Sequence, residues 1–280
     1  MGAEKLVNVV LSGLGWELKH IRNARGLSLE VVCQQLRWQQ SKLSRMENGQ
    51  QHISDADLAA LLVIYEVHSE ERRQLLRLAQ RQDAPGYWDL DPPIKTAPFA
   101  RMELEATSIV DAQTILIPGL AQTAEYTDAL MKAASVPPEE AALRVAARMA
   151  RKNILDKGKP PNFDMILDEM ALRRPVGGRA VMARQLRALL ELAERPNVRL
   201  WVLPIDRGWR VAFHYGFYVF NFPRSQSVVF LENKETCVYL EDETKVEVFR
   251  RHAGKLGKAA LNPAESITFV GSIGKEYERE

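Results

Sequence analysis

Four polar side chains between Gln40 and Arg45 have the types and the spacing that reading base edges in double-stranded DNA requires. Gln pairs bidentately with adenine, Arg pairs bidentately with guanine, and Ser pairs with either base. In a helix over this segment, Leu43 and Met46 face inward and leave a polar outer face. Lys42 is better placed for a phosphate group. The candidate base-reading residues are Gln40, Ser41, Ser44 and Arg45.

A second short helix must position this face. Ser28 can cap the N-terminus of a helix that runs to about Leu36, and the next helix is expected from about Gln40 to Glu47, ended by Asn48-Gly49. Two short helices joined by a tight turn can cross at the angle that sends the second one into a major groove. The residues spaced to pack the two helices together are Val32, Cys33, Leu36, Leu43 and Met46.

Helical periodicity extends to both sides of this pair. A helix over Leu14 to Arg25 is expected to stop at Gly26, and Ser54 with Asp55 starts a helix through Tyr65. Further helical sequence runs from Ser69 to Arg81. The first part of the chain is therefore expected to be an all-α headpiece.

Local charge agrees with a nucleic-acid partner, although the whole chain carries a net charge of only +2. Between Leu18 and Met46, six basic residues stand against Glu30 alone, which gives this window a net charge of +5. Such residues supply phosphate contacts and most of the non-specific affinity for DNA. The candidate phosphate-contacting residues are Lys42, Lys19, Arg22 and Arg37.

A proline-rich break separates the headpiece from the rest of the chain. Residues 83–98 contain Pro85-Gly86, Pro92-Pro93 and Pro98, which neither a helix interior nor a central strand tolerates. We therefore expect a helix-turn-helix domain at 1–82, a linker at 83–98 and a second domain at 99–280 for sensing, partner binding or dimerisation.

The second domain mixes two periodicities, so the fold class is multidomain: an all-α headpiece followed by an α+β domain. The last three expected strands are consecutive and joined by short turns, which predicts an antiparallel meander. Helices are expected over 99–110, 121–134, 139–156, 179–193 and 241–261. Strands are expected over 163–167, 198–203, 217–222, 227–232 and 236–240.

Other residues that could carry chemistry have simpler roles. Asp168 with Glu169, or Glu232 with Glu241 and Asp242, could serve as paired carboxylates, but adjacent acids at a strand end or helix start usually cap helices. Arg173-Arg174 could hold an anion, and a surface ion pair is the simpler reading. We therefore expect no enzyme activity, no metal and no cofactor. The five histidines show no metal-ligand spacing.

An aromatic cluster in the second domain leaves two readings open. Aromatic residues stand on both faces of the strand expected at 217–222, so one face must belong to the core. The other face could pack on a helix, or it could line a ligand pocket or a dimer interface. The cluster consists of Trp201, Trp209, Phe213, Tyr215, Phe217, Tyr218, Phe220 and Phe222.

The location follows from what the sequence lacks. Cys33 and Cys237 are the only cysteines and are far apart, which excludes a disulfide framework or a zinc cluster and favours reduced thiols in a cytoplasm. No segment approaches the roughly 20 apolar residues of a membrane span. We expect a cytoplasmic protein without membrane contact.

The helix pair resembles the Xre family of repressor-type helix-turn-helix domains over residues 14–67. Nearly every position of the recognition-helix pattern of that family is matched by Gln40-Ser41-Lys42-Leu43-Ser44-Arg45-Met46-Glu47-Asn48-Gly49. Two positions before this segment depart from what is usual in the family. Arg37 stands where the inter-helix turn usually has glycine, so a non-glycine must adopt the turn conformation. Leu29 stands where the family often has a phosphate-contacting Gln, so we expect that contact to be absent.

The second domain resembles a domain of unassigned function that follows such headpieces in many actinobacterial regulators, often described as antitoxin-like. The resemblance covers about 100–265. It implies sensing or partner binding, with a small partner protein encoded nearby. The matching phrases are Leu116-Ile117-Pro118-Gly119-Leu120-Ala121-Gln122-Thr123, Asp168-Glu169-Met170-Ala171-Leu172-Arg173-Arg174-Pro175-Val176-Gly177 and Tyr239-Leu240-Glu241-Asp242.

These expectations combine into a bacterial transcriptional regulator that binds double-stranded DNA. A homodimer on two half-sites about one DNA turn apart is the expected arrangement. A small-molecule effector or a small partner protein would act through the second domain. The alternative is an antitoxin-like interaction protein that binds its small partner and uses DNA binding only to regulate its own operon.

Overall fold

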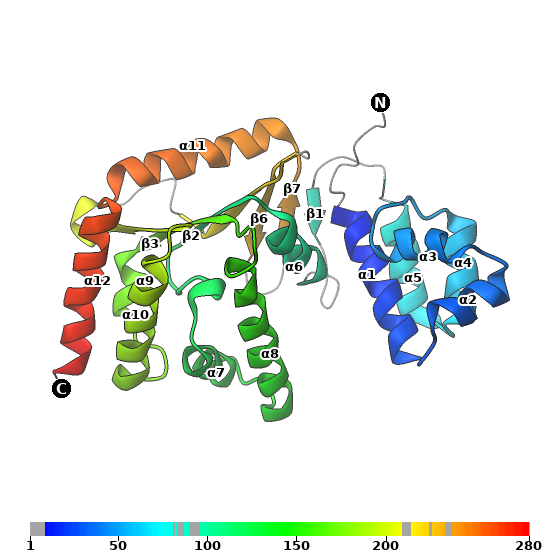
Figure 1. The fold of residues 1–280 in the computed structure, drawn as a ribbon, viewed down its shortest axis with the longest axis horizontal. Coiled ribbons are helices and arrows are strands. Elements are labelled where there is room, and N and C mark those ends of the chain that lie inside the picture. Colours follow the sequence, from blue (N-terminus) through cyan, green and yellow to red (C-terminus); the bar gives the residue numbers. More distant parts are fainter. Residues whose placement is uncertain are drawn as a thin grey trace. The chain divides into compact units, whose positions relative to one another are not determined.

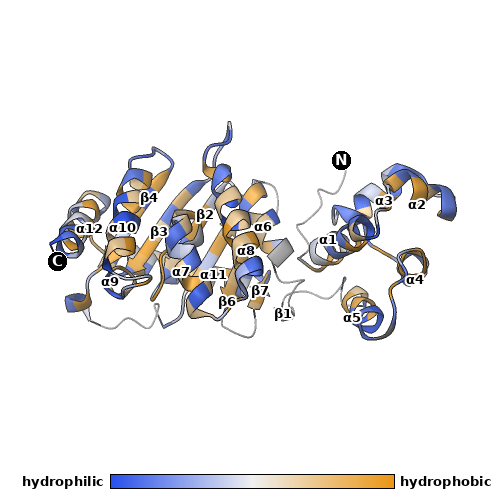
Figure 2. Cartoon of the chain, turned by 90° about the horizontal axis from the view of Figure 1, so that it is seen from below, coloured by the Kyte–Doolittle hydropathy of each residue, from blue (hydrophilic) through white to orange (hydrophobic). Residues whose placement is uncertain are grey.

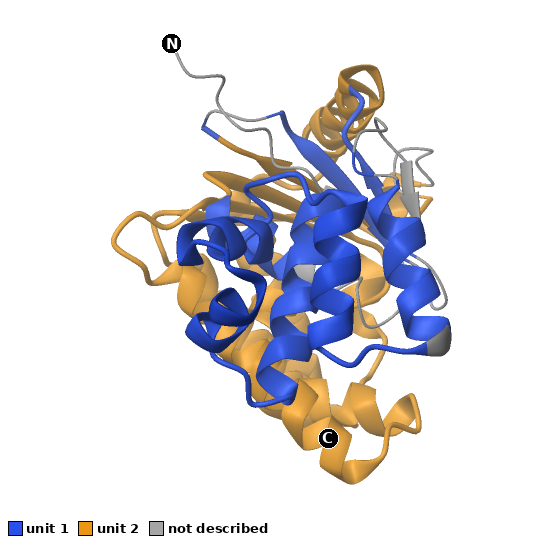
Figure 3. Cartoon of the chain, turned by 90° about the vertical axis from the view of Figure 1, so that its right-hand side faces the viewer, with its two compact units in different colours: residues 1–105, 223–242 blue, residues 106–222, 243–280 orange. Residues whose placement is uncertain are grey.

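The computed structural model describes residues 9–80, 82, 87–89, 96–208, 214–223, 226–232 and 237–279. The chain divides into two compact units, shown in Figure 3. Unit 1 contains residues 1–105 and 223–242, and unit 2 contains 106–222 and 243–280. Most of the linker expected at 83–98 lies outside the described residues, and the domain boundaries that we predicted stay predictions.

The first part of unit 1 is a cluster of five helices, as the sequence predicts (Figure 1). They are α1 (Val9–Ala24), α2 (Leu29–Leu36), α3 (Gln40–Glu47), α4 (Asp55–Ile64) and α5 (Ser69–Ala79). Each helix buries one apolar stripe against the others. The fully buried side chains of this cluster include Leu14, Leu18, Leu43, Met46, Leu58 and Tyr65.

The remaining described elements of unit 1 are one helix and three strands. The helix is α6 (Thr96–Glu105), and the strands are β1 (Tyr87–Asp89), β6 (Val228–Glu232) and β7 (Cys237–Leu240). β7 pairs antiparallel with both β1 and β6. Phe230 on β6 packs against both Phe99 and Tyr239, with tilted rings at centroid distances of 4.7 and 4.8 Å.

Unit 2 is built on a mixed sheet in the order β5-β2-β3-β4. β2 (Ser108–Gln113), β3 (Asn162–Asp168) and β4 (Val198–Leu203) are parallel, and β5 (Phe217–Asn221) is antiparallel to β2. The antiparallel meander that we predicted is not confirmed, because the sheet is mixed: the pairs β2–β3 and β3–β4 are parallel, and helices connect these strands.

Helices cover both faces of this sheet. In Figure 1, α11 lies on one side of it and α7, α8 and α10 lie on the other. Figure 2 shows hydrophobic strands behind helices whose outer sides are more hydrophilic. The helices of unit 2 are α7 (Ala124–Ala133), α8 (Pro138–Arg151), α9 (Glu169–Arg173), α10 (Arg179–Ala193), α11 (Glu243–Ala259) and α12 (Pro263–Glu278).

Several expected elements are confirmed and others are wrong. The helix at 179–193 and the strand at 198–203 have the predicted bounds. The helix expected over 99–110 is wrong in its second half, because α6 ends at Glu105 and residues 108–113 form the central strand β2. The sequence analysis missed α9 and α12, although Asn262 and Glu265 form a capping box at the start of α12.

Part of the aromatic cluster belongs to the core of unit 2. Phe217 and Phe220 are buried, and Phe217 packs edge-on against Phe249 at 5.2 Å between ring centroids. Tyr215, in contrast, is exposed. Trp209 and Phe213 lie outside the described residues.

Candidate nucleic-acid interface

The turn between α2 and α3 is closed by backbone hydrogen bonds around Arg37. The Ser28 hydroxyl caps α2 by accepting from the Val31 N–H at 3.2 Å. At the other end, Arg37 has φ 55° and ψ 40°, and the Trp38 N–H donates to the Cys33 carbonyl at 2.9 Å. This is a Schellman turn with a non-glycine in the left-handed position. The conformation expected of Arg37 is confirmed.

The two helices pack through the apolar residues that their spacing indicates. Val32, Cys33, Leu43 and Met46 are buried, while Leu36 is half-buried. Burial raises the pKa of the Cys33 thiol, so this side chain is a small apolar core residue at neutral pH.

A buried ion pair joins α3 to α1. Arg22 Nε donates to Glu47 Oε1 at 2.6 Å, and Arg22 Nη2 donates to Glu47 Oε2 at 2.9 Å. The third arm of the guanidinium, Nη1, donates to the Leu27 carbonyl at 2.7 Å, and the Tyr65 hydroxyl donates to Glu47 Oε1 at 3.4 Å. The hydrogen bond to Glu47 raises the pKa of Arg22. The pair holds the C-terminal end of α3 against α1.

This pair buries the Arg22 side chain. Its side chain is 7% exposed, and each nitrogen of its guanidinium already donates to Glu47 or Leu27. A phosphate contact would require breaking a buried bidentate pair, which is costly. The burial of Arg22 therefore argues against the phosphate contact that we expected.

The outer face of α3 carries the four candidate base-reading residues. Gln40, Ser41 and Arg45 are exposed, and Ser44 is half-buried. The Ser44 hydroxyl accepts from Asn48 Nδ2 at 3.3 Å. The structure thus presents three of the four side chains to solvent on a helix whose opposite face is buried.

Of the other three residues that we expected to contact phosphates, two are exposed and one forms an ion pair within the protein. Lys19 and Arg37 are exposed. Lys42 Nζ donates to Asp57 Oδ1 at 2.7 Å and lies 4.0 Å from the centre of the Trp38 ring. Lys42 therefore also ties α3 to α4, and its charge is partly neutralised by Asp57.

The end of α3 is fixed by a second Schellman turn, as Asn48-Gly49 predicts. The Gly49 N–H donates to the Met46 carbonyl at 3.0 Å, and the Gln50 N–H donates to the Arg45 carbonyl at 2.8 Å. Gly49 has φ 60°, and a Cβ on it would lie 2.7 Å from Ser12 Cα. Only glycine fits this close approach.

Three partners of the site escaped the sequence analysis. Asp57 and Trp38 hold Lys42, and Gln51 accepts from Arg45 Nε at 3.1 Å. Each acts across a turn or from the next helix, and spacing within α3 carries no signal of them. The Asn48-Gly49 turn was the available hint that residues just beyond it fold back toward α3.

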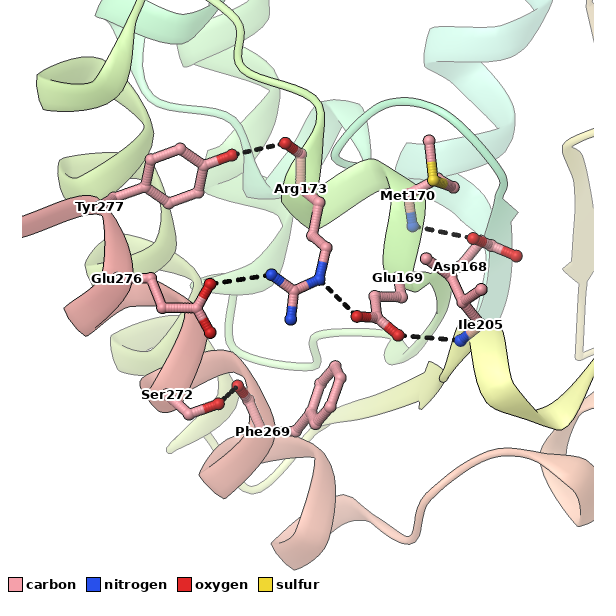
Figure 4. A network of polar contacts seen from close by, with 9 residues as sticks. All are labelled: Asp168, Glu169, Met170, Arg173, Ile205, Phe269, Ser272, Glu276 and Tyr277. Carbon is pink, nitrogen blue, oxygen red and sulfur yellow. Dashed lines mark hydrogen bonds and ion pairs between the residues drawn. The ribbon is translucent and has the colours of Figure 1, made fainter.

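The carboxylates of unit 2 have structural partners, shown in Figure 4. Asp168 caps α9 by accepting from the Met170 N–H at 2.8 Å, which confirms its reading as a cap. Glu169 accepts from Arg173 and, at 2.8 Å, from the Ile205 N–H. Arg173 also donates to Glu276 at 2.9 Å, so the ion-pair reading of this arginine is confirmed.

Two further observations concern metal binding and membrane crossing. Within the described ranges, no group of His, Cys, Asp and Glu side chains is arranged to hold a metal ion. In the same part of the chain, no helix combines the length and the apolar character that crossing a membrane needs.

Comparison with known protein families gives two matches. Residues 13–76 match a helix-turn-helix domain, and residues 96–272 match a domain of unknown function, DUF5753. The resemblance to a helix-turn-helix regulator with an unassigned C-terminal domain is thereby confirmed. No curated protein matches the sequence.

One similar solved structure is described as "Structure of TrmBL2, an archaeal chromatin protein, shows a novel mode of DNA binding". It is 15% identical, with a TM-score of 0.34. The match covers 68% of this chain and 60% of that chain.

Proposed function

We propose that this chain, which belongs to the family of the domain of unknown function DUF5753 and carries a helix-turn-helix domain before it, is a sequence-specific transcriptional regulator of the Xre type. The observation that carries the proposal is the outer face of α3. Gln40, Ser41 and Arg45 are exposed there, on a helix whose inner face is buried and whose two ends are fixed.

The interface then divides into two kinds of contact. Gln40, Ser41, Ser44 and Arg45 read base edges in a major groove. Lys19 and Arg37 contact phosphates, with a smaller share from Lys42 because Asp57 already binds its ammonium group. Arg22 is left out of the contacting set because it is buried on Glu47. A chain with this role acts in the cytoplasm, where a bacterial genome lies.

The experiment is a selection of bound duplexes from a random library by the full chain. A Gln40→Ala/Arg45→Ala variant serves as the test. A Gln74→Ala/Arg77→Ala variant is the matched control, because it removes the same side-chain types from exposed positions of α5. We expect a short motif with the wild type and the control, and none with the test variant. A library without enrichment in the wild-type selection would contradict the proposal.

For the DUF5753 domain we propose a response to an effector or a partner, and a role in forming a homodimer. The supporting observation is a row of exposed apolar residues at one edge of the unit 2 sheet. Three of these residues lie two positions after the ends of β2, β3 and β4, and the fourth lies two positions before the start of β5. The strand register brings these four strand ends to the same edge of the sheet. The row is Tyr215, Ile115, Met170 and Ile205, from 38% exposed at Met170 to 73% at Tyr215.

Ligands of open α/β sheets bind outside the carboxyl ends of the strands, and exposed apolar residues gathered in one place mark binding surfaces. The same row supports the alternative, in which the chain is an antitoxin-like protein that binds a small partner. Co-purification from the native host separates the two: a stoichiometric small protein that releases DNA favours the alternative. A homodimer that binds DNA without such a partner favours the regulator.

A further inference from the structure

Gln51 lies in a loop whose path is fixed on both sides. On its N-terminal side, the Schellman turn at Gly49 ends α3. On its C-terminal side, Ile53 is fully buried. The Gln82 side chain binds the N–H of Ile53 at 2.9 Å and its carbonyl at 2.8 Å. The backbone at Gln51 therefore has little freedom, and it returns along the last turn of α3.

The half-buried Gln51 side chain contacts one group of the recognition helix. Its Oε1 accepts from Arg45 Nε at 3.1 Å, while Arg45 itself is exposed. Within the described residues, the two terminal nitrogens of Arg45 have no protein partner. The bond thus occupies one of the five N–H donors of the guanidinium and leaves the four donors of Nη1 and Nη2 available to a ligand.

We propose that Gln51 is a positioning residue that sets how Arg45 meets a base. An arginine can bind guanine O6 and N7 side-on, with Nε and one Nη, or end-on, with both Nη groups. Because Gln51 holds Nε, only the end-on approach remains. The inference rests on the proposed function and adds to it the base class, a guanine, and the geometry with which Arg45 reads it.

The fixed side chain also improves affinity. An arginine that is free in solution loses rotamer freedom when it binds, whereas Arg45 is already oriented in the unbound protein. Gln51 therefore acts through Arg45 and needs no DNA contact of its own. Removing it should weaken binding to the cognate motif and leave binding to random DNA unchanged.

The test uses Gln51→Met in the full chain, because methionine keeps the length and loses the amide acceptor. Gln50→Met is the matched control, since Gln50 is exposed and takes part in the turn only through its backbone. We expect Gln51→Met to lose about three- to tenfold in affinity for the selected motif, with a flattened preference at one guanine position. The control should lose nothing.

A double-mutant cycle separates positioning from a direct role. In an Arg45→Ala background, Gln51→Met should change affinity by less than about twofold, because the residue through which it acts is gone. A similar loss in both backgrounds, with the motif still selected by the wild type, would overturn the inference and leave the proposed function standing. A wild-type chain that selects no motif would overturn the proposed function, and with it the guanine assignment.

A measurement without DNA tests the contact independently. The Nε–H resonance of Arg45 in ¹⁵N–¹H spectra of the free protein should shift in Gln51→Met and stay in place in Gln50→Met. An unshifted resonance in Gln51→Met would show that Arg45 is not held by Gln51, and would overturn the inference whatever the DNA results.

Discussion

Arg22 on α1 and Glu47 at the end of α3 form a buried bidentate ion pair, with Nε–Oε1 and Nη2–Oε2 distances of 2.6 and 2.9 Å. The pair is a buried polar link between α3 and α1. Its carboxylate also accepts from Tyr65, whose pKa burial raises, so that the hydroxyl stays a donor. The outer face of α3 depends on this inner contact for its orientation.

Breaking the pair on one side should be costly. Glu47→Ala leaves Arg22 charged and buried, and we expect a loss of about 3–5 kcal/mol in the free energy of unfolding. Urea denaturation followed by circular dichroism measures it. The double variant Arg22→Met/Glu47→Leu should recover most of the loss, because no charge is left unpaired. A double variant as unstable as Glu47→Ala would contradict this account of the pair.

Glu17 on α1 is a second buried acid, and it should make the stability of the headpiece depend on pH. Burial raises the pKa of Glu17 above its usual 4.5, with a smaller opposing effect of His20 and a smaller additional rise from Glu71. Among the described atoms, Glu17 Oε2 has no hydrogen-bond partner. The folded state then holds its proton to higher pH than the unfolded chain, so stability falls as pH rises from 4.5 through the folded-state pKa.

Glu17→Gln should remove this fall. We expect the variant to be about 1–2 kcal/mol more stable than the wild type at pH 7 and to differ less at pH 4. Urea titrations at the two pH values measure the difference. A variant that is equally stable, or less stable, at pH 7 would show that the Glu17 carboxylate has found a favourable environment.

The turn at Arg37 contains removable strain. A non-glycine residue in the left-handed region destabilises the folded state by about 1–2 kcal/mol. Glycine avoids this cost, but its greater freedom in the unfolded chain offsets part of the gain in stability. Arg37→Gly should therefore stabilise the protein by about 0.5–1 kcal/mol. Thermal unfolding measures it, and Arg37→Val, which is β-branched, should destabilise. If Arg37→Gly lowers the melting temperature, the side chain contributes contacts that outweigh the strain.

The salt dependence of DNA binding should distinguish the exposed Lys19 from Lys42, which already forms an ion pair with Asp57. Lys19→Ala should reduce the slope of log K against log salt by about 0.9 if Lys19 meets one phosphate. Lys42→Ala should reduce the slope by less, because Asp57 already binds the Lys42 ammonium group. Fluorescence anisotropy over a salt series measures both slopes. Equal reductions would mean that DNA displaces Asp57 from Lys42.

The sequence predicted α3 well, because the limits of this helix are set locally. Ser28 and the Asn48-Gly49 pair are strong boundary signals, and the apolar spacing of Leu43 and Met46 defines the inner face. The outer-face residues follow from that inner face. Nothing further along the chain was needed to place Gln40 and Arg45.

The predictions that failed concern residues whose structural partners are distant along the chain. Arg22 resembles any basic residue of an amphipathic helix until Glu47, 25 residues later, is seen beside it. The segment 99–110 has apolar residues that fit a helix, but Ile109 and its neighbours complete a sheet with β3 and β5, and strand pairing across the chain decided the outcome. The parallel order of β2, β3 and β4 likewise depends on packing that periodicity does not encode.

The most direct test of the central claim is the affinity of Arg45→Ala for the selected motif and for a random duplex of equal length, at one near-physiological salt concentration. If α3 reads bases through its outer face, the variant loses about 1–3 kcal/mol on the motif, relaxes preference at one position and keeps its affinity for the random duplex. An equal loss on both duplexes would show that Arg45 meets a phosphate, and an unchanged affinity for the motif would show that this face of α3 does not read the DNA.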